Sequence, residues 1–490
     1  MRTPGAMPNH PQQHAADATT RPGARAAKQP HRHRAAPGWI PVDHERAGTM
    51  KKRVLIISFD YPPRRTSAVH RMTAMTRYLT DHGWEPTVLT IREERDASEP
   101  ALLEKLPPQV RIVRTPYLRL MQLDNQAATV LRRAGFLPTS NNGRGPSQVG
   151  RWLRGMAALV RSTLYFPDET AGWIPFALLQ AVRLHMERPF DLVYTTTPPR
   201  AAPVVGLLLK DLFGVPWVSE FMDPWYPKPQ RLRARADSWL YAHVMRRADR
   251  VVVMMQGHAD ELIQRQGLPA EKFAVVRNGF WEEDFAALDA TPANALPPGF
   301  VHLSHFGTVY HGNEGKFFEA LAELLGECPE LKARLRLNIG GYPHSGIVEF
   351  IRNSALNEIT EFYPYLSDRT QVLQMLRASD FLLLLWGRPD YSRQAIAGKT
   401  YDYLRTGRPI LAVTSPGGIQ ELIEGADAGW VLPPEDPARI KEILKSVLKN
   451  YQRKDALPHP RRPEFVAQFR WDRQAERLAR VFEETVAHAR

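Results

Sequence analysis

The amino-acid sequence predicts an α/β protein built from two doubly wound, Rossmann-like domains that face each other across a cleft. Short, mostly apolar runs alternate with longer segments whose apolar residues recur every three or four positions, which is the pattern of parallel strands joined by helices. A proline-rich stretch at 290–298 interrupts this alternation, which then starts again. The length of 490 residues also exceeds what one hydrophobic core accommodates.

The first series of elements begins at Val54–Ser58, a mostly apolar run that predicts a strand buried on both faces. A helix is predicted next, because apolar residues from Val69 to Leu79 follow helical spacing and Gly83 is a stop signal. The remaining predicted strands of this half are Pro86–Ile91, Arg111–Thr115, Asp191–Thr197, Pro216–Phe221, Arg250–Met255 and Phe273–Asn278. Helical stretches separate most of these strands, so we expect one parallel sheet.

The second series repeats this architecture without repeating the sequence. Its predicted strands are His302–Gly307, Leu335–Gly340, Ile359–Tyr365, Asp380–Trp386, Pro409–Thr414 and Trp430–Pro433. Its predicted helices are Gly315–Gly326, Ser345–Ala355, Arg369–Arg377, Lys399–Thr406, Gly418–Ile423 and Pro437–Lys449. Ligands of such sheets bind at the carboxyl ends of the strands, so two facing sheets predict a shared cleft.

The domain boundaries follow from these two series. The predicted parts are a tail at 1–50, Rossmann-like domains at 51–297 and 298–463, and a closing segment at 464–490. The tail mixes Pro, His, Gln, Arg and Ala without periodicity, which predicts disorder. Met50 directly precedes the basic start of the first strand, so we expect either that Met50 is the natural start or that the tail is dispensable. The helical pattern Glu464–His488 is long enough to pack back across both domains.

Composition narrows the class of protein. The single cysteine, Cys328, excludes an internal disulfide and a metal site built on several thiolates, and it suits a reducing, cytoplasmic compartment. No apolar run approaches the roughly 20 residues that span a bilayer. The net charge is +13, and arginines cluster at 132–161 and 231–250. Such clusters suit phosphates on nucleic acid, anionic lipid or a pyrophosphate-bearing substrate, although a solvated helix face explains any single arginine better.

The most informative segment is Gln394–Leu411, with the sequence QAIAGKTYDYLRTGRPIL. A loop after a predicted strand ends at Ala397, and a helix starts there whose N–H groups and positive dipole suit a phosphate. Gly398 lets a ligand approach the backbone, Lys399 adds a positive charge, and Asp402 can accept two hydrogen bonds from a ribose diol. On its residues alone, the segment fits an ordinary α/β loop equally well.

This segment resembles the K-(L)-(F/Y)-E-Y-L-x-x-G-x-P-(I/V)-L signature of retaining family 4 glycosyltransferases. As in that family, a Gly417-Gly418 turn and the run Ala428–Pro437 follow it. The resemblance covers roughly residues 51 to 450 and implies the two-domain GT-B fold. In that fold the amino-terminal domain binds the acceptor and the carboxy-terminal domain binds the nucleotide-sugar. No cofactor or metal is expected, since the sequence lacks an Asp-x-Asp pair and backbone dipoles with cations can hold the diphosphate.

The resemblance implies which residues bind the donor. The family's Glu–seven residues–Glu pair, which contacts the donor sugar and the ribose, corresponds to Gln394 and Asp402, so an amide replaces the first carboxylate. After the glycine turn that underlies the diphosphate, Thr308 stands where family members often carry an Arg, and Lys316 corresponds to a later Lys. The donor-binding residues implied in this way are Gly307, Thr308, Tyr365, Leu366, Gln394, Ala397, Gly398, Thr400 and Asp402.

Three loops of the amino-terminal half resemble the acceptor side of such enzymes. Asp60–Ser67 has the place of the acceptor loop, while Thr195–Pro199 and Phe221–Trp225 resemble the "S-P-P" and "D-x-R-D-P-W" segments of bacterial polysaccharide glycosyltransferases. Met222 stands where Arg is usual. Asp223 could orient the acceptor hydroxyl or take its proton, and a turn aspartate explains it equally well. The implied acceptor-binding residues are Arg64, Arg65, Ser67, Arg71, Pro198 and Trp225.

We therefore expect a retaining glycosyltransferase that moves a sugar from a nucleoside-diphosphate sugar to a glycan or lipid-linked hydroxyl, in cell-surface polysaccharide or glycoconjugate synthesis. Lys399 and Lys316 would stabilise the leaving diphosphate, and Asp223 would serve the acceptor. The basic stretches 151–161 and 231–250 would seat the protein on the inner face of the plasma membrane. Nucleic acid is not expected, because no recognition motif accompanies the charge. The alternatives are a sugar-nucleotide epimerase of the same architecture and a non-catalytic binding protein.

Overall fold

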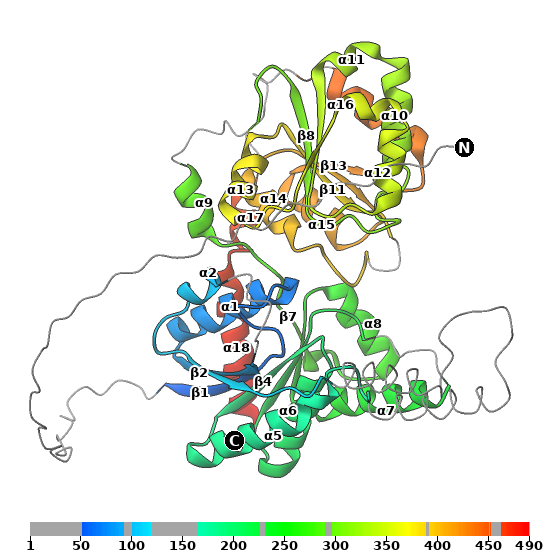
Figure 1. Cartoon of the computed structure of the whole chain (residues 1–490). Helices are drawn as coiled ribbons and strands as arrows, with labels where there is room; N and C mark the ends of the chain where they lie inside the picture. The colour runs from blue at the N-terminus through cyan, green and yellow to red at the C-terminus, as the bar shows by residue number, and fades with distance from the viewer. Residues whose placement is uncertain are drawn as a thin grey trace, which may run out of the picture. The chain divides into compact units, whose positions relative to one another are not determined.

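A computed structural model describes residues 51–92, 100–119, 165–225, 231–289, 296–388, 392–449, 451 and 462–489. The predicted tail at 1–50, the candidate start Met50 and the basic stretch at 132–161 lie outside these residues. Lys51–Arg490 form one compact unit, within which the chain builds two separate parallel sheets (Figure 1). The predicted pair of doubly wound domains is confirmed.

The first sheet has seven parallel strands in the order β3-β2-β1-β4-β5-β6-β7. Its strands are β1 (Lys52–Ile57), β2 (Trp84–Ile91), β3 (Arg111–Thr115), β4 (Leu192–Thr197), β5 (Trp217–Phe221), β6 (Arg250–Val253) and β7 (Phe273–Val275). The strand order reverses between β1 and β4. Loops leave in opposite directions at such a reversal, and the crevice between them is where ligands of these sheets bind.

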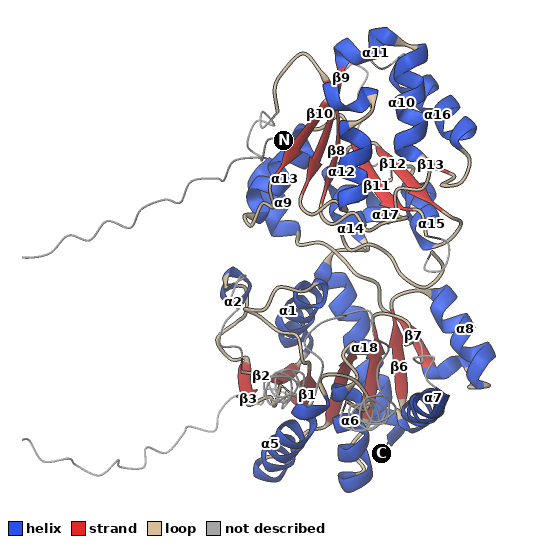
Figure 2. Cartoon of the chain, turned by 45° about the vertical axis from the view of Figure 1, so that its right-hand side comes forward, coloured by secondary structure: helices blue, strands red, loops and turns tan. Residues whose placement is uncertain are grey.

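Both faces of this sheet are buried, as the continuous apolar runs predicted. Leu55 and Ile57 of β1 belong to one core cluster, while Val54 and Ile56 belong to another on the opposite face. The helices of this half are α1 (Ser67–Leu79), α2 (Ala101–Glu104), α5 (Ile174–Glu187), α6 (Ala201–Phe213), α7 (Arg231–Arg247) and α8 (Gln256–Gln266). Figure 2 shows the helices, in blue, packed around the strands, in red.

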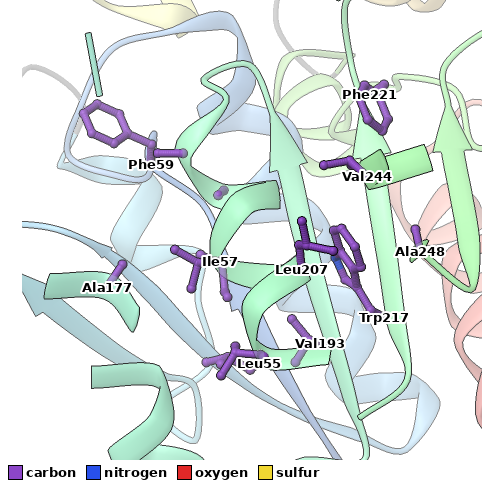
Figure 3. Close-up of a cluster of buried hydrophobic side chains, with 14 of the residues drawn as sticks. Leu55, Ile57, Phe59, Ala177, Val193, Leu207, Trp217, Phe221, Val244 and Ala248 are labelled. Carbon is purple, nitrogen blue, oxygen red and sulfur yellow. The ribbon is translucent and has the colours of Figure 1, made fainter. Parts of the chain in front are cut away.

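Helix α6 lies unusually close to the sheet. A Cβ atom at Gly206 would lie 2.6 Å from both Thr195 Cγ2 and Trp217 Nε1, so only glycine fits there. Figure 3 shows Leu207 of the same helix beside the Trp217 ring, with Ile57 in the same core. This packing holds β4 and β5 firmly, and the loops that follow these strands carry Pro198 and Asp223.

The second sheet has six parallel strands in the order β10-β9-β8-β11-β12-β13. Its strands are β8 (Val301–Phe306), β9 (Leu335–Gly340), β10 (Thr360–Tyr363), β11 (Phe381–Trp386), β12 (Ile410–Thr414) and β13 (Gly429–Leu432). The order reverses between β8 and β11, which repeats the topology of the first sheet. Every strand predicted for both halves is present within a few residues of its expected bounds.

The helices around the second sheet largely follow the prediction. They are α9 (Glu282–Asp289), α10 (Phe317–Glu327), α11 (Pro329–Arg334), α12 (Ser345–Arg352), α13 (Arg369–Ala378), α14 (Lys399–Thr406), α15 (Gly418–Ala426) and α16 (Pro437–Lys449). Helices α14 and α16 begin and end at the predicted residues. Cys328 lies between α10 and α11 and is buried in the core as a small hydrophobic residue.

The closing segment differs from the single helical stretch predicted over Glu464–His488. It consists of α17 (Pro463–Ala467) and α18 (Trp471–Ala489), separated by residues 468–470. At the break, the Phe280 N–H donates to the Phe469 carbonyl at 3.1 Å, and the Trp471 N–H donates to the Phe280 carbonyl at 3.1 Å. Because these backbone groups pair with another segment, they cannot complete a continuous helix.

The two pieces of the closing segment pack on different sheets. Phe465 of α17 lies against Gly425 of α15, where an added Cβ would come within 2.4 Å of its ring. Helix α18 packs on the amino-terminal half, and its Phe482 ring meets those of Trp84 and Tyr194 at centroid distances of 5.3 and 5.2 Å. Figure 1 shows α18, in red, beside the blue α1. The segment therefore contacts both halves.

Candidate active site

The carboxyl ends of the two sheets border a common cavity of about 570 Å³. Asp60, Pro198 and Asp223, which follow β1, β4 and β5, contribute to its amino-terminal wall. Thr308 after β8 and Lys399 at the start of α14 contribute to the opposite wall. Both strand-order reversals therefore open onto it, as expected for ligand sites of doubly wound sheets. The volume falls within the roughly 300–1,000 Å³ typical of small-molecule sites.

Lys399 places its amino group beneath the glycine turn that ends β8. A Cβ atom at Gly307 would lie 2.5 Å from Lys399 Nζ, and Gly307 also has a left-handed φ of 127°, so the turn requires glycine. Lys399 Nζ lies 3.0 Å from Nε2 of His305. His305 Nδ1 lies 2.8 Å from the carbonyl oxygen of Leu383, so Nδ1 donates there and Nε2 accepts from the lysine.

Burial tunes the charge of this pair. Burial lowers the pKa of Lys399 to about 7. Burial, together with the neighbouring lysine, lowers the pKa of His305 well below its usual value, which keeps the ring neutral at pH 7. The amine is therefore divided between its charged and neutral forms near neutral pH. An anion bound beside it favours the charged form, so the site can take up a proton as a phosphate arrives.

The start of α14 adds backbone donors at the same wall. Gly398 and Lys399 both line the cavity, and in the described part of the chain their N–H groups donate to no protein acceptor. The next N–H group, of Thr400, donates to the Ala397 carbonyl at 2.9 Å and closes the first turn. An anion at this helix start meets two N–H groups, the positive end of the helix dipole and the lysine amine.

Asp402 also lines the cavity, but its carboxylate has a protein partner. Arg369, the first residue of α13, donates from Nη1 to Oδ2 at 3.1 Å and from Nη2 to Oδ1 at 2.8 Å. The Nε of Arg369 donates to Asp284 of α9 at 2.6 Å. The predicted ribose-binding carboxylate is thus held in a forked ion pair, and Arg369 itself lines the same cavity.

Asp223 faces the cavity from the amino-terminal half. It follows β5 directly after Met222 and has no protein partner among the described residues. The side chain is exposed to the cavity, and desolvation by the surrounding protein raises the pKa of its carboxyl group. A carboxylate with these properties is suited to accept a hydrogen bond or a proton from a hydroxyl group held in the cavity.

The predicted nucleobase loop lines a second cavity of about 550 Å³, which shares His70 and Arg369 with the first. Tyr365 and Leu366 both contribute to its wall. The Tyr365 ring stacks on Tyr342 at a centroid distance of 5.2 Å and an interplanar angle of 12°. The guanidinium of Arg65, from the amino-terminal half, lies 3.8 Å from the centroid of the Tyr365 ring. The loop is therefore braced by both halves.

Besides Tyr365 and Leu366, which line the second cavity, three further predicted donor or catalytic residues lie away from the first cavity. Gln394 donates from Nε2 to the carboxylate of Glu261 in α8, so its amide links the two halves. Lys316 precedes α10, lies 3.1 Å from Glu319 and has a side chain that is 44% exposed. Thr400 is fully buried in α14. The predicted residues that do line the first cavity are Pro198, Asp223, Thr308, Ala397, Gly398, Lys399 and Asp402.

The predicted acceptor loop, Asp60–Ser67, reaches the cavity through Asp60 and Thr66, and Pro198 lines the cavity from the loop after β4. Arg64 lies beside the cavity wall, because its Nε is 2.9 Å from Asp60 Oδ1. Arg65 is exposed, and its guanidinium contacts the Tyr365 ring of the carboxy-terminal half. Ser67 is the first residue of α1. The loop is thus oriented by a local ion pair, and its arginines engage protein groups.

The other two predicted acceptor residues support the amino-terminal core. Arg71 is buried and forms an ion pair with Glu220 of β5, with Nε distances of 3.1 and 3.2 Å. Its remaining groups donate to the Val276 and Arg277 carbonyls at 2.9 and 2.7 Å, so its guanidinium is engaged inside the protein. Trp225 is buried beneath Arg200, whose guanidinium lies 4.8 Å from its ring centroid.

Sequence reasoning missed two residues that shape the site. His305 lies in the strand that was recognised before the glycine turn, and its alternation in the strand does not reveal a partner 94 positions away. Arg369 was placed correctly at the start of a helix, but its contact with Asp402 spans 33 positions. No local sequence pattern predicts either contact. Both contacts depend on which strands and helices the folded sheet brings together.

Two family models match the chain in succession. The model described as "Glycosyl transferase 4-like domain" matches residues 67–279, and the model described as "Glycosyl transferases group 1" matches residues 306–450. The first range covers most of the first sheet and the second covers most of the second sheet. A D-inositol 3-phosphate glycosyltransferase of Streptomyces scabiei is 24% identical over 218 residues. This match covers 41% of the chain and spans about half, 46%, of that relative.

Solved structures share the fold over most of the chain. Anabaena HepE in complex with UDP is 16% identical, with a TM-score of 0.57 over 88% of this chain and 100% of its own. A glycosyltransferase of Rickettsia africae is 14% identical, with a TM-score of 0.58 over 89% and 98%. Sucrose-phosphate synthase of Thermosynechococcus elongatus is 15% identical, with a TM-score of 0.57 over 89% and 100%. HepE is also described in complex with UDP-glucose.

Proposed function

We propose that this chain, which has the GT-B architecture and matches glycosyl transferase models in both halves, transfers a sugar from a nucleoside-diphosphate sugar to a hydroxyl acceptor and retains the anomeric configuration. The observation that carries the proposal is the anion site made by Lys399, the start of α14 and the turn at Gly307. HepE, which has this fold, is described with UDP and UDP-glucose, so uridine-diphosphate sugars are the first donors to test.

The anion site suits the leaving group of this reaction. The bond between the anomeric carbon and a diphosphate oxygen breaks, and negative charge grows on the departing diphosphate. The Lys399 amine and the N–H groups of Gly398 and Lys399 are already in place to stabilise that charge. Preorganised donors aimed at developing charge contribute strongly to catalysis. Since Lys316 does not line the cavity, we assign this role to Lys399 and the helix start.

Asp223 lies on the cavity wall opposite the anion site, where it can bind the acceptor hydroxyl group. The acceptor oxygen bonds to the anomeric carbon as the old bond breaks, and its proton passes to the departing diphosphate oxygen. Asp223 orients the hydroxyl by accepting its hydrogen bond, and Pro198 borders the same wall. We propose that no metal is needed, because Lys399 and backbone dipoles supply the positive charge and the sequence has no Asp-x-Asp pair.

The acceptor we propose is a glycan or a lipid-linked glycan, in the synthesis of cell-surface polysaccharide or glycoconjugate. The segments Thr195–Pro199 and Phe221–Trp225, which resemble those of polysaccharide glycosyltransferases, contribute Pro198 and Asp223 to the acceptor side of the cavity. This proposal predicts that transfer to a lipid-linked oligosaccharide exceeds donor hydrolysis in an assay with purified protein. Hydrolysis alone across a panel of such acceptors would contradict it.

We also propose that α7 rests on an anionic membrane surface on the cytoplasmic side. Trp239 of this helix is 63% exposed and stacks on His243 at 5.0 Å, and Arg246 and Arg247 lie in its last turn. An exposed aromatic ring beside arginines suits an anionic lipid surface. None of the described helices is long and apolar enough to cross a bilayer. Co-sedimentation with liposomes that depends on neither salt nor anionic lipid would contradict this.

The central experiment measures donor binding and turnover. We expect a thermal-shift panel of UDP, GDP, ADP and dTDP sugars to show stabilisation by at least one donor, because binding to the native state raises stability by mass action. The Lys399→Met variant should lose that stabilisation and the transfer of labelled sugar. Lys316→Met is the matched control, since it makes the same change at a lysine outside the cavity. If no donor binds and no sugar is transferred, the proposal fails.

A further inference from the structure

The carboxylate of Asp402 is not a solitary group in the cavity, because a second charged residue holds it. We propose that Arg369 is a positioning residue of the donor site, which orients Asp402 and with it recognises a ribose that carries both its 2′- and 3′-hydroxyl groups. This inference rests on the proposed function, because it concerns the nucleoside part of the same donor.

The geometry of the pair is that of a fork. Two terminal nitrogens of Arg369 each donate to a different oxygen of Asp402, at 3.1 and 2.8 Å. Two parallel bonds fix the plane of a carboxylate, whereas one bond leaves it free to rotate. The side chains are 31% and 18% exposed, so the pair is partly sheltered from water and still reaches the cavity that both residues line.

Arg369 is itself held from its other edge. Its Nε donates to Asp284 of α9 at 2.6 Å, and Lys105 lies 2.5 Å from the same carboxylate. Burial alone would raise the pKa of Asp284, but the charges of Arg369 and Lys105 outweigh it and lower the pKa. The guanidinium therefore sits between two carboxylates, in a chain of alternating charges that begins near α2. These ion pairs hold the carboxylate of Asp402 in a defined orientation.

The remaining hydrogen-bonding capacity matches a ribose diol. An ionised carboxylate offers about four acceptor sites, and the fork from Arg369 uses one on each oxygen of Asp402. One site per oxygen is left, enough for two hydroxyl protons. Arg369 has five N–H groups, and the three bonds described use three of them, which leaves two N–H groups at the cavity. Asp402 and Arg369 thus form one recognition unit.

The short side chain of Asp402 makes this partner important. In the resembling family a glutamate stands at this position, and an aspartate extends one methylene less into the site. A shorter carboxylate must be placed accurately to reach both hydroxyl groups, and the fork supplies that placement. The consequence is a preference for ribonucleoside diphosphates over their 2′-deoxy forms, because loss of one hydroxyl leaves an ionised acceptor unpaired.

The test compares two arginines of the same helix. Arg369→Gln removes the fork, and Arg369→Lys keeps the charge without the fork geometry. Arg377→Gln is the matched control, because Arg377 lies at the other end of α13, contacts α9 near Asp289 and lines neither cavity. Calorimetric titration measures the dissociation constants of UDP and 2′-deoxy-UDP for each protein. If GDP or ADP stabilises the parent protein more than UDP does, that nucleotide and its 2′-deoxy form are used instead.

We expect the parent to bind the ribonucleotide about 10- to 100-fold more tightly than the deoxy form, as for a hydrogen bond to a charged group. Arg369→Gln and Arg369→Lys should reduce this ratio to about threefold or less, while Arg377→Gln keeps it. The ratio is internal to each protein, so a general loss of stability does not change it. A parent that binds none of UDP, GDP, ADP and dTDP contradicts the proposed function itself, whereas a parent that binds only dTDP, which lacks the 2′-hydroxyl group, overturns this inference alone. A parent that binds one of them without discrimination, or an Arg369 variant with the full ratio, overturns this inference alone.

Discussion

The low pKa of Lys399 makes a quantitative prediction about nucleotide binding. With a pKa of about 7, roughly one site in ten carries the charged amine at pH 8. Bound diphosphate holds the proton on the amine, so the complex carries more protons than the free site above pH 7. Affinity for UDP should therefore fall as pH rises, by about tenfold or 1.4 kcal/mol for each unit above 7. Below pH 6 the amine is charged in both states, and this dependence disappears.

Titration calorimetry at pH 8 in two buffers of different ionisation enthalpy measures the proton uptake directly. We expect about 0.9 proton taken up per UDP bound by the parent, from a pKa of about 7. The Lys399→Met variant should bind about 10- to 100-fold more weakly at pH 7 and show no uptake from this site. Tight binding by the parent with no proton uptake would refute the reasoning, and so would an unchanged uptake in the variant.

Three further substitutions and one pH dependence test the surrounding residues. Gly307→Ala places a methyl group 2.5 Å from Lys399 Nζ, so we expect at least about a tenfold loss of UDP affinity by calorimetry. Asp223→Asn should lower the transfer rate about 100-fold with donor affinity within about twofold, and equal losses in both would contradict its acceptor role. Because burial raises the pKa of Asp223, the parent's transfer rate should also decline with acid above the usual range for aspartate. Arg71→Met leaves Glu220 buried without its cation, and urea unfolding should show about 3–5 kcal/mol of lost stability.

The fold was largely predictable because its strands are buried on both faces. Phe381–Trp386 has the sequence FLLLLW, and such uninterrupted apolar runs mark strands of a parallel sheet without any knowledge of their neighbours. The break at 468–470 was not predictable in the same way. Helical spacing continues through it, and only pairing with Phe280 interrupts the helix. Tertiary contacts override local propensity at this point.

The part of the candidate site that was predictable is the part whose residues lie in one continuous segment of the sequence. Gly398, Lys399 and Asp402 sit at a helix start after a strand, and a helix start has the same chemistry in any protein. Gln394 belongs to the same segment, yet its amide contacts Glu261 of the other half. Arg71 carries the charge expected of an acceptor site, yet its partner lies inside the first sheet. Residue type and position in the sequence did not show which of these side chains line the cavity and which contact other protein groups.

By itself, the sequence determined the two parallel sheets, their order along the chain and the helix start that offers an anion site. These features follow from periodicity and from backbone geometry, which are local properties of the chain. Only the tertiary structure decided which charged groups face the cavity and which face each other. Pairs such as Lys399 with His305 and Asp402 with Arg369 arise because strands and helices that are far apart in the sequence meet at the same edge of a sheet. That edge is assembled by packing, so no local stretch of sequence encodes the distances across it.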